Sequence, residues 1–320
     1  MHPDETREAP AAGDAEADPL AAPETAPESA PAPQPEPPAD PAAPVLRGLE
    51  ILNPDDLDDD FDEEEEDDDE EEYNDEDSVR TVLITGASGN IGRKLRDAWA
   101  DVYDLVLLDR ETELDDREVI RADLSELDES WLAHFHGVDT VIHLAANPND
   151  LATWEELEHP NLDALANVFH AAALAGVERV IFASSNHAMG GYRELGDMPI
   201  TVDLPPRPDG PYGAAKLMGE RLGRSLSRAF DITFIALRLG WVQHGLNRPD
   251  TLHDDWARSS WLSNNDMIRL FDAAVEAELD DRLFVVVNGM SNNRGTRWDL
   301  SPAADLLGYS PEDDAYAEEI

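Results

Sequence analysis

A tyrosine and a lysine stand four residues apart in PYGAAKLMGERLGRSLSRAF, residues 211–230. Residues i and i+4 share one face of a helix, so the phenol of Tyr212 and the ammonium of Lys216 would lie side by side. A nearby cation favours the phenolate and lowers the pKa of a tyrosine toward the range where it removes protons. The chain has only one other lysine, Lys94, so the spacing is a specific signal. The pair predicts a tyrosine that acts as a general base.

A second polar group follows the apolar run of VERVIFASSNHAMGGY, which spans residues 177–192. The run leads into Ser185, Asn186 and His187, and then into a pair of glycines. Ser185 stands 27 residues before Tyr212 and would hydrogen-bond a reacting oxygen if both faced one crevice. Serine and asparagine also begin turns at strand ends, so a purely structural role is the alternative.

Three glycines mark a third motif, TGASGNIG, which lies between the apolar run 79–85 and a helical pattern over 90–100. Glycines between a strand and a helix allow a tight turn and the close approach of a pyrophosphate to helix-terminal amides. A turn without a ligand is the alternative. The motif predicts a dinucleotide site formed by Gly86, Ser88, Gly89, Asn90, Ile91 and Gly92.

A carboxylate ends the next apolar run, since Asp109 lies 23 residues beyond Gly86. A carboxylate at this point accepts both hydroxyls of the adenosine ribose and repels a 2′-phosphate, which favours NAD over NADP. Arg110 follows directly and weakens that preference unless it faces solvent. Asp123 and Leu124, at the end of a third run, are placed to border the adenine.

The motifs alternate with elements that form a parallel sheet. Strands alternating with helices imply βαβ units, whose ligands gather beyond the carboxyl ends of the strands. We therefore predict an α/β fold with a Rossmann-type, doubly wound parallel sheet. The predicted strands are 79–85, 103–109, 117–124, 140–146, 177–185 and 232–240, and the predicted helices are 90–100, 125–135, 154–176 and 211–230.

The sequence is acidic both in an N-terminal extension and beyond it. Residues 1–78 hold 30 acidic residues against two arginines, and low hydrophobicity with self-repulsion predicts that they are disordered. Residues 79–320 still carry 42 acids against 21 bases, which favours a protein adapted to high salt; an ordinary acidic enzyme is the alternative. The sequence identifies no partner for the acidic extension.

Composition also excludes several classes of function. The net charge of −49 repels nucleic acid and anionic membranes, so we expect neither as a partner. The chain has no cysteine, which excludes disulfides, thiolate nucleophiles and cysteine-bound zinc, and we assign no metal site. No signal-peptide pattern and no stretch of roughly 18 apolar residues is present, so we expect a cytoplasmic protein.

Together the motifs resemble the extended short-chain dehydrogenase/reductase superfamily, the NAD-dependent epimerase/dehydratase superfamily. The resemblance covers roughly residues 79–310 and rests on TGASGNIG, Asp109, HLAA at 143–146, Ser185 and YGAAK. SSNHAMGGY, PYGAAKLMGE, WLSNND and LLGYSPEDDA resemble the uronate dehydrogenases. They are still more similar to the haloarchaeal branch that includes an NAD-dependent glucose-6-phosphate dehydrogenase.

The resemblance implies roles for individual residues. Ser185, Asn186 and His187 would contact a sugar, and Asn161 would support the active site. Tyr212 and Lys216 would also touch the cofactor, and the family implies a homo-oligomer. The HLAA motif adds three cofactor contacts, Leu144, Ala145 and Ala146.

Two positions depart from the uronate dehydrogenase pattern. Those enzymes carry an arginine for the substrate carboxylate five residues before the tryptophan of their W-[FL]-S motif, where this chain has Trp256. The nearest arginine is Arg258, three residues before Trp261, and we take it as the candidate substrate anchor, with Arg248 as the alternative. Residues 147–148 read NP where a serine is expected. Both departures weigh against a uronate substrate.

These observations lead to one expected function and two alternatives. We expect a cytoplasmic, NAD-dependent dehydrogenase that oxidises an aldose, a sugar acid or a sugar phosphate at C1 to a lactone. A nucleotide-sugar epimerase or dehydratase is the first alternative, although only 104 residues follow Lys216. A non-catalytic NAD-binding sensor is the second. The predicted domains are the extension 1–78, an NAD-binding domain 79–240 and a small substrate lobe 241–320.

Overall fold

The computed structural model describes residues 79–113 and 116–317 of the chain. The predicted disordered extension, residues 1–78, lies outside the described residues. In chain order the helices and strands are β1 (Thr81–Thr85), α1 (Asn90–Trp99), β2 (Asp104–Asp109), β3 (Val119–Arg121), α2 (Glu129–Leu132), β4 (Thr140–His143), α3 (Trp154–Leu157), α4 (Ala164–Leu174), β5 (Arg179–Ser185), α5 (Pro211–Phe230), β6 (Thr233–Leu239), α6 (Asp255–Ser259), α7 (Asn264–Glu276), β7 (Phe284–Gly289) and α8 (Ser301–Leu307).

The strands of the described residues form one parallel sheet in the order β3-β2-β1-β4-β5-β6-β7. The chain winds outward from β1 to β3 and then returns to the other side of β1 at β4. The strand order therefore reverses between β1 and β4, where doubly wound sheets open a crevice for ligands. This arrangement confirms the predicted α/β, Rossmann-type fold.

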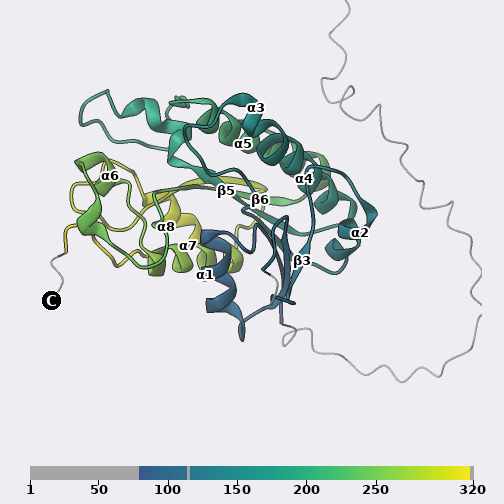
Figure 1. Ribbon diagram of the computed structural model, residues 1–320. Coiled ribbons are helices and arrows are strands. Elements are labelled where there is room, and N and C mark those ends of the chain that lie inside the picture. Colours follow the sequence, from purple (N-terminus) through teal and green to yellow (C-terminus); the bar gives the residue numbers. More distant parts are fainter. Residues whose placement is uncertain (1–78, 114–115, 318–320) are drawn as a thin grey trace, which may run out of the picture. The chain divides into compact units, whose positions relative to one another are not determined.

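Helices cover both faces of the sheet (Figure 1). On one face α1, α7 and α8 bury apolar side chains such as Trp99 and Phe271 against the strands. On the other face α2, α4 and α5 do the same, with Trp131, Phe169 and Leu226 in the core. The strands between the two layers are buried on both sides, which explains their nearly continuous apolar sequences.

The predicted strands 117–124 and 140–146 are shortened to β3 and β4, and three further elements differ from the sequence-based prediction. The predicted helix over 154–176 is divided, because a π-helical turn, Glu158–Asp163, separates α3 from α4. Pro160 lies in this turn and has no backbone N–H to donate, which favours a local break in the α-helical hydrogen bonds. The predicted helix over 125–135 is reduced to α2 and the 3₁₀ turn Ala133–Phe135. The edge strand β7 was not predicted at all.

Helix α5 lies close to the sheet around Gly219 and Gly223. A Cβ atom on Gly219 would come within 2.5 Å of the Phe182 ring, and one on Gly223 within 2.1 Å of the Phe234 ring. The aromatic rings therefore occupy the space that larger residues of the helix would need. Positions 216, 219 and 223 fall on one helix face, so the stripe that carries Lys216 is the one that contacts the sheet.

A buried ion pair joins α5 to β6 beneath that stripe. The guanidinium of Arg238 donates to both carboxylate oxygens of Glu220 at 2.8 Å, and both side chains are almost fully buried. Ser184, on β5, donates to the same carboxylate at 2.6 Å. The three side chains tie two adjacent strands to the helix, next to the position of Ser185.

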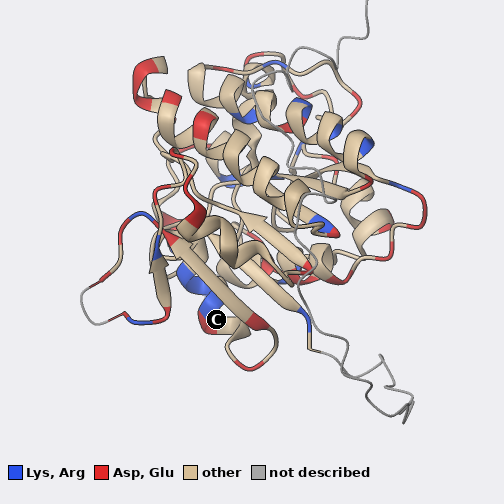
Figure 2. Ribbon diagram, turned by 90° about the vertical axis from the view of Figure 1, so that its right-hand side faces the viewer, with Lys and Arg blue, Asp and Glu red and all other residues tan. Residues whose placement is uncertain are grey.

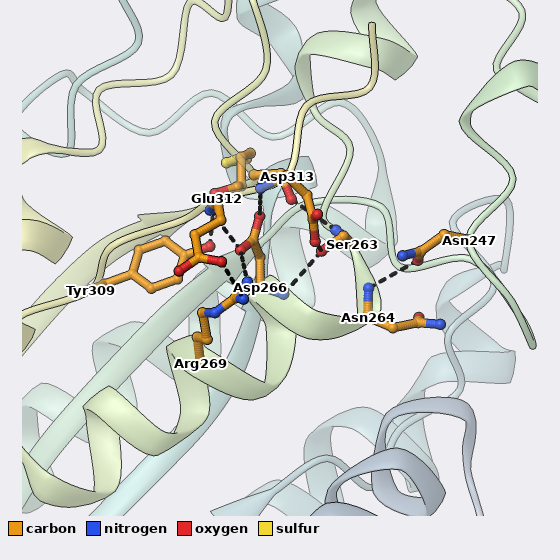
Figure 3. A network of polar contacts seen from close by, with 10 residues as sticks. Asn247, Ser263, Asn264, Asp266, Arg269, Tyr309, Glu312 and Asp313 are labelled. Carbon is orange, nitrogen blue, oxygen red and sulfur yellow. Dashed lines mark hydrogen bonds and ion pairs between the residues drawn. The ribbon is translucent and has the colours of Figure 1, made fainter. Parts of the chain in front are cut away.

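The residues after 307 are fastened to the start of α7 (Figure 3). The buried carboxylate of Asp266 accepts the backbone N–H groups of Glu312 and Asp313 at 2.9 and 3.0 Å. Arg269 donates to it at 2.7 Å. Ser263 caps α7 by accepting the N–H of Asp266 and also bonds the Asp313 carboxylate. The WLSNND segment therefore holds residues 312 and 313 against α7 in this chain.

Residues after 240 contribute β7 to the sheet, and some of them also line the cleft at its edge. The predicted domain boundary at residue 240 stays a prediction.

Figure 2 shows acidic residues spread over the helices and loops of the described part, with fewer basic residues among them. No helix within residues 79–113 and 116–317 has the length and apolar character of a membrane span.

Candidate active site

A cleft of about 1510 Å³ opens beyond the carboxyl ends of the strands, at the reversal point of the sheet. Its lining joins the glycine-rich motif, the ends of β2, β4, β5 and β6, and the start of α5. The structure thereby brings together residues that lie between Gly86 and Ser260 in the sequence. The predicted site residues in the lining are Gly86, Ser88, Gly89, Asn90, Ile91, Gly92, Asp109, Asp123, Leu124, Leu144, Ala145, Ala146, Ser185, Asn186, His187, Tyr212 and Lys216.

The glycine-rich motif presents free hydrogen-bond donors to the cleft. Gly86 has a φ of +74°, and a Cβ there would lie 2.8 Å from the backbone nitrogen of Ala145. Helix α1 begins after Gly89 without a side-chain cap, so its first N–H groups remain available for an anion. The buried Ser88 hydroxyl has no hydrogen-bond partner among the described residues. This arrangement fits a pyrophosphate.

Asp109 is held in place by two backbone amides at the end of β2. Its carboxylate accepts the N–H of Ser88 at 2.8 Å and that of Glu111 at 3.0 Å. One of these bonds links the carboxylate directly to the glycine-rich motif. A carboxylate fixed at this point suits the two hydroxyls of an adenosine ribose. Arg110 lies beside it with an exposed guanidinium near Glu111.

Tyr212 and Lys216 lie together at the floor of the cleft. The Lys216 ammonium lies 5.7 Å from the centre of the Tyr212 ring and 5.1 Å from that of Phe182. Burial raises the pKa of Tyr212 to about 12; the Ser185 hydroxyl lowers it and the charge of Asp150 raises it, both to a smaller extent. The pKa of Tyr212 is therefore shifted upward, in the direction opposite to the lowering that was expected from Lys216.

Lys216 itself is a buried cation, and no residue within 79–113 or 116–317 supplies it with a counter-ion. Its side chain is only 6% exposed, and burial lowers its pKa to about 8. Its Nζ makes no hydrogen bond or ion pair to any residue that the structure describes. An ammonium in this state is poised to bind hydroxyl groups of a ligand in the cleft, such as those of a ribose.

Ser185 has the structural role that the sequence offered as the alternative, and it also lies beside Tyr212. Its hydroxyl accepts the N–H of His187 at 3.2 Å and so caps a 3₁₀ helix, Asn186–Tyr192. The same hydroxyl faces the cleft and lies near the phenol of Tyr212, whose pKa it lowers. The turn after β5 thus aims the serine at the position where a reacting oxygen would lie.

Asn161 supports the site from the π-helical turn. Its side chain accepts the N–H of Asn147 at 2.8 Å and donates to the carbonyl of Asn147 at 3.2 Å. The asparagine is 4% exposed, so it does not itself offer a surface to a ligand. It fixes the loop after β4, whose residues line the cleft.

Arg258, predicted to anchor the substrate, does not belong to the cleft lining. Its guanidinium lies 5.3 Å from the centre of the Tyr316 ring, on the other side of α6. Successive helical residues are about 100° apart, so Trp256, two positions earlier, faces the cleft instead. We therefore withdraw Arg258 as a substrate residue.

Several residues of the lining were not recognised from the sequence. Arg193 and Asp254 both line the cleft and form an ion pair at 2.6 Å. Trp241, after β6, and Asp150, after β4, border the same end. None of them lies in a recognisable motif. Proximity to the SNH tripeptide is the one sequence signal that points to Arg193.

Comparison with known proteins agrees with this geometry. The model of the family described as "NAD dependent epimerase/dehydratase family" matches residues 82–243. The chain is 35% identical over 255 residues to the NAD-dependent glucose-6-phosphate dehydrogenase of Haloferax volcanii, covering 73% of this chain and 94% of that protein. It is 32% identical over 252 residues to the L-arabinose 1-dehydrogenase (NAD(P)(+)) of the same organism, covering 73% and 97%.

A solved structure is similar as well. A tyrosine-to-alanine mutant of uronate dehydrogenase from Agrobacterium tumefaciens, complexed with NAD, has a TM-score of 0.64 and 30% identity. It covers 74% of this chain and 86% of its own. The chain belongs to the NAD-dependent epimerase/dehydratase family.

Proposed function

We propose that the protein is an NAD-dependent sugar dehydrogenase that oxidises the hemiacetal carbon C1 of an aldose to a lactone. The observation that carries the proposal is the convergence of Ser185, Tyr212 and Lys216 in one cleft with an uncapped helix N-terminus and a fixed Asp109. The relatives named above act on glucose 6-phosphate and L-arabinose by their names, which supports a sugar substrate for this chain.

The residues of the cleft divide the reaction between them. NAD⁺, when bound by the glycine-rich motif and Asp109, supplies a hydride acceptor. Tyr212 takes the proton of the C1 hydroxyl while the C1–H bond breaks with its electron pair, and the C1–O bond becomes the carbonyl of the lactone. Ser185 orients the C1 oxygen by a hydrogen bond, and Lys216 binds ribose hydroxyls and stabilises the phenolate of Tyr212.

Proton removal by a positioned side chain contributes roughly 10²–10⁴-fold to a rate. Because the pKa of Tyr212 is raised to about 12, the phenolate fraction grows as the pH rises toward that value. We expect turnover to increase with pH between about 6 and 8, below the pKa values of Lys216 and Tyr212.

The experiment is to follow NADH at 340 nm with a panel of aldoses, uronates and sugar phosphates, comparing NAD with NADP on each. One sugar should give a steady rate, and Tyr212→Phe should lower it by roughly 10²–10⁴-fold while NAD binding is retained. Full turnover by Tyr212→Phe would contradict the assigned base. No net NADH with any free sugar would instead favour an epimerase or dehydratase that acts on a nucleotide-sugar.

The residues that line the cleft also favour one class of sugar. At the sugar end of the cleft the guanidinium of Arg193 is paired with Asp254, and Trp256 stands where uronate dehydrogenases carry an arginine. Both features support an aldose over a uronate.

A further inference from the structure

The imidazole of His187 is hydrogen-bonded to the carboxylate of Asp209, a residue that belongs to none of the motifs recognised in the sequence. Its Nδ1 atom lies 3.0 Å from both carboxylate oxygens of Asp209. A carboxylate only accepts hydrogen bonds at neutral pH, so Nδ1 must carry the proton. The side chains of His187 and Asp209 are 28% and 37% exposed, so the pair lies at the rim of the protein rather than in its core.

The backbone around Asp209 holds the carboxylate in place. The N–H of Arg207 donates to the carbonyl of Ala188 at 3.1 Å, and the N–H of Asp209 donates to the carbonyl of His187 at 3.4 Å. The segment before α5 thus runs alongside the 3₁₀ helix that carries His187. A Cβ atom on Gly190 would lie 1.9 Å from Asp209 Oδ2, so the carboxylate fits only because residue 190 is a glycine.

The opposite nitrogen of the ring faces the cleft. His187 lines the cleft, and its Nε2 atom lies 3.9 Å from a carboxylate oxygen of Asp150. The ring of Tyr212 stands edge-on to the imidazole, with the ring centres 5.7 Å apart. The imidazole of His187 therefore packs against the side chain that we assign as the base, with Nε2 on the side of Asp150.

We propose that Asp209 is a positioning residue, which keeps the imidazole of His187 doubly protonated so that Nε2–H donates to an oxygen of the sugar beside the reacting carbon. This inference rests on the proposed sugar dehydrogenase function and adds to it a residue that acts through His187. A neutral imidazole bonded to Asp209 through Nδ1–H would leave Nε2 as an acceptor. The charge on Asp209 decides which of the two forms binds the sugar.

The charges around the ring agree with this assignment. Burial lowers the pKa of His187, but the hydrogen bond and charge of Asp209, with the charge of Asp150, outweigh burial and raise it. Helix α5 presents the phenol of Tyr212 to the ring, with Lys216 one turn further along. The 3₁₀ helix of His187, residues 186–192, has no other charged residue. The two acids are thus the groups that set the protonation of the ring.

Asp209→Asn tests the proposal because asparagine still accepts from Nδ1–H but carries no charge. Removing a charge this close lowers a histidine pKa by about one unit or more. We expect the ratio of the variant KM to the wild-type KM to be near 1 at about pH 5.5 and to rise about tenfold by about pH 7.5, with kcat changed less than about threefold. All assays use one KCl concentration, because salt screens a partly exposed pair.

A double-mutant cycle separates positioning from folding. His187→Gln donates through its amide at every pH, so Asp209→Asn in that background should leave KM unchanged. Asp150→Asn, in an exposed loop, serves as the matched variant if Asp209→Asn folds poorly, and its effect on KM should have the same pH dependence with a smaller size. A KM ratio that is equally raised at all pH values, or an undiminished effect in the His187→Gln background, would overturn the proposal.

Titration of the His187 imidazole, which needs no enzyme turnover, tests the role of Asp209 separately from the proposed function. The imidazole proton signal of His187, assigned by its loss in His187→Gln, should titrate above the ordinary value of about 6.5 in the full chain and lower in Asp209→Asn. Equal titration in both proteins contradicts the role of Asp209 whatever the enzyme oxidises. A shifted titration together with no sugar turnover would contradict the proposed function alone.

Discussion

Replacing Gly223 by alanine tests whether the sheet sets the position of the catalytic helix. The new Cβ atom would lie 2.1 Å from the tip of the Phe234 ring, whereas carbon atoms in contact are about 3.5–4.0 Å apart. The mismatch is therefore about 1.5 Å. The ring has little room to withdraw, because Phe169, Phe182 and Phe284 surround it with ring centres 5.1–6.2 Å away. We expect the helix to move instead.

Two opposing contributions determine the stability of this variant. Alanine is favoured over glycine in a helix by about 1 kcal/mol, while overpacking a well-filled core costs about 1–3 kcal/mol. The net loss should be at most about 2 kcal/mol, which is a fall in Tm of only a few degrees for a protein of this size. Activity should suffer more, since a displacement of about 1 Å at a catalytic group costs up to about 10²-fold.

The assay compares kcat for sugar oxidation and Tm for Gly223→Ala, for Gly223→Ala with Phe234→Leu, and for Ser225→Ala. The double variant relieves the clash and should recover most of the lost kcat. Ser225→Ala lies on the exposed side of α5 and should leave both quantities nearly unchanged. If Gly223→Ala alone keeps full kcat, the ring moves and the helix does not, and the reasoning is refuted.

Other substitutions probe the remaining contacts. Glu220→Ala leaves the guanidinium of Arg238 buried without its partner and should lower the free energy of unfolding by about 3–5 kcal/mol, measured by urea denaturation; a loss below about 1 kcal/mol would contradict a buried pair. Asp109→Ser removes the carboxylate expected to bind ribose and should shift the ratio of kcat/KM for NAD over NADP by about 10–100-fold toward NADP; an unchanged ratio would place the ribose elsewhere. The pKa of Lys216 is about 8 in the folded protein and about 10.4 in the unfolded chain, so the unfolded chain binds more protons between these values and stability should rise with pH there. That rise, about 2 kcal/mol by pH 9.5, should be missing in Lys216→Met.

Much of the fold was predictable because each strand carries its signal locally. The apolar runs that end in Thr85, Asp109 and Ser185 are bounded by turn residues, and the structure has strands at each of them. Strand β7 was missed although FVVVNG has the same character, since it follows a segment without a chemical motif. Pro160 lies in the π-helical turn that divides the predicted helix. The apolar pattern continues on both sides of this turn, so the pattern alone predicts one unbroken helix.

The candidate site was predictable where its residues share a motif or end a recognisable strand, as Asp109 does. The glycine-rich loop and the Tyr212–Lys216 pair have fixed spacing along one chain segment, so their geometry follows from it. Asp209 and Arg193 reach the site through loops, whose paths the sequence does not specify. Arg258 was misplaced because the rotation of the short helix α6 is set by its contacts and not by its residue types.

The contact between residues 312–313 and α7 is connected, through further hydrogen bonds, to the wall of the cleft that we expect to bind the cofactor. Glu312 and Asp313 are held by Asp266, and Asn264 in the same helix turn donates to the loop after β6. In that loop the carbonyl of Gln243 accepts from Lys94, on the helix that follows the glycine-rich motif. One wall of the cleft is thus tied to residues more than 200 positions further along the chain. We expect a chain cut before Glu312 to release a bound dinucleotide faster than the intact chain, because this wall of the cleft would lose its contact with the residues beyond the cut.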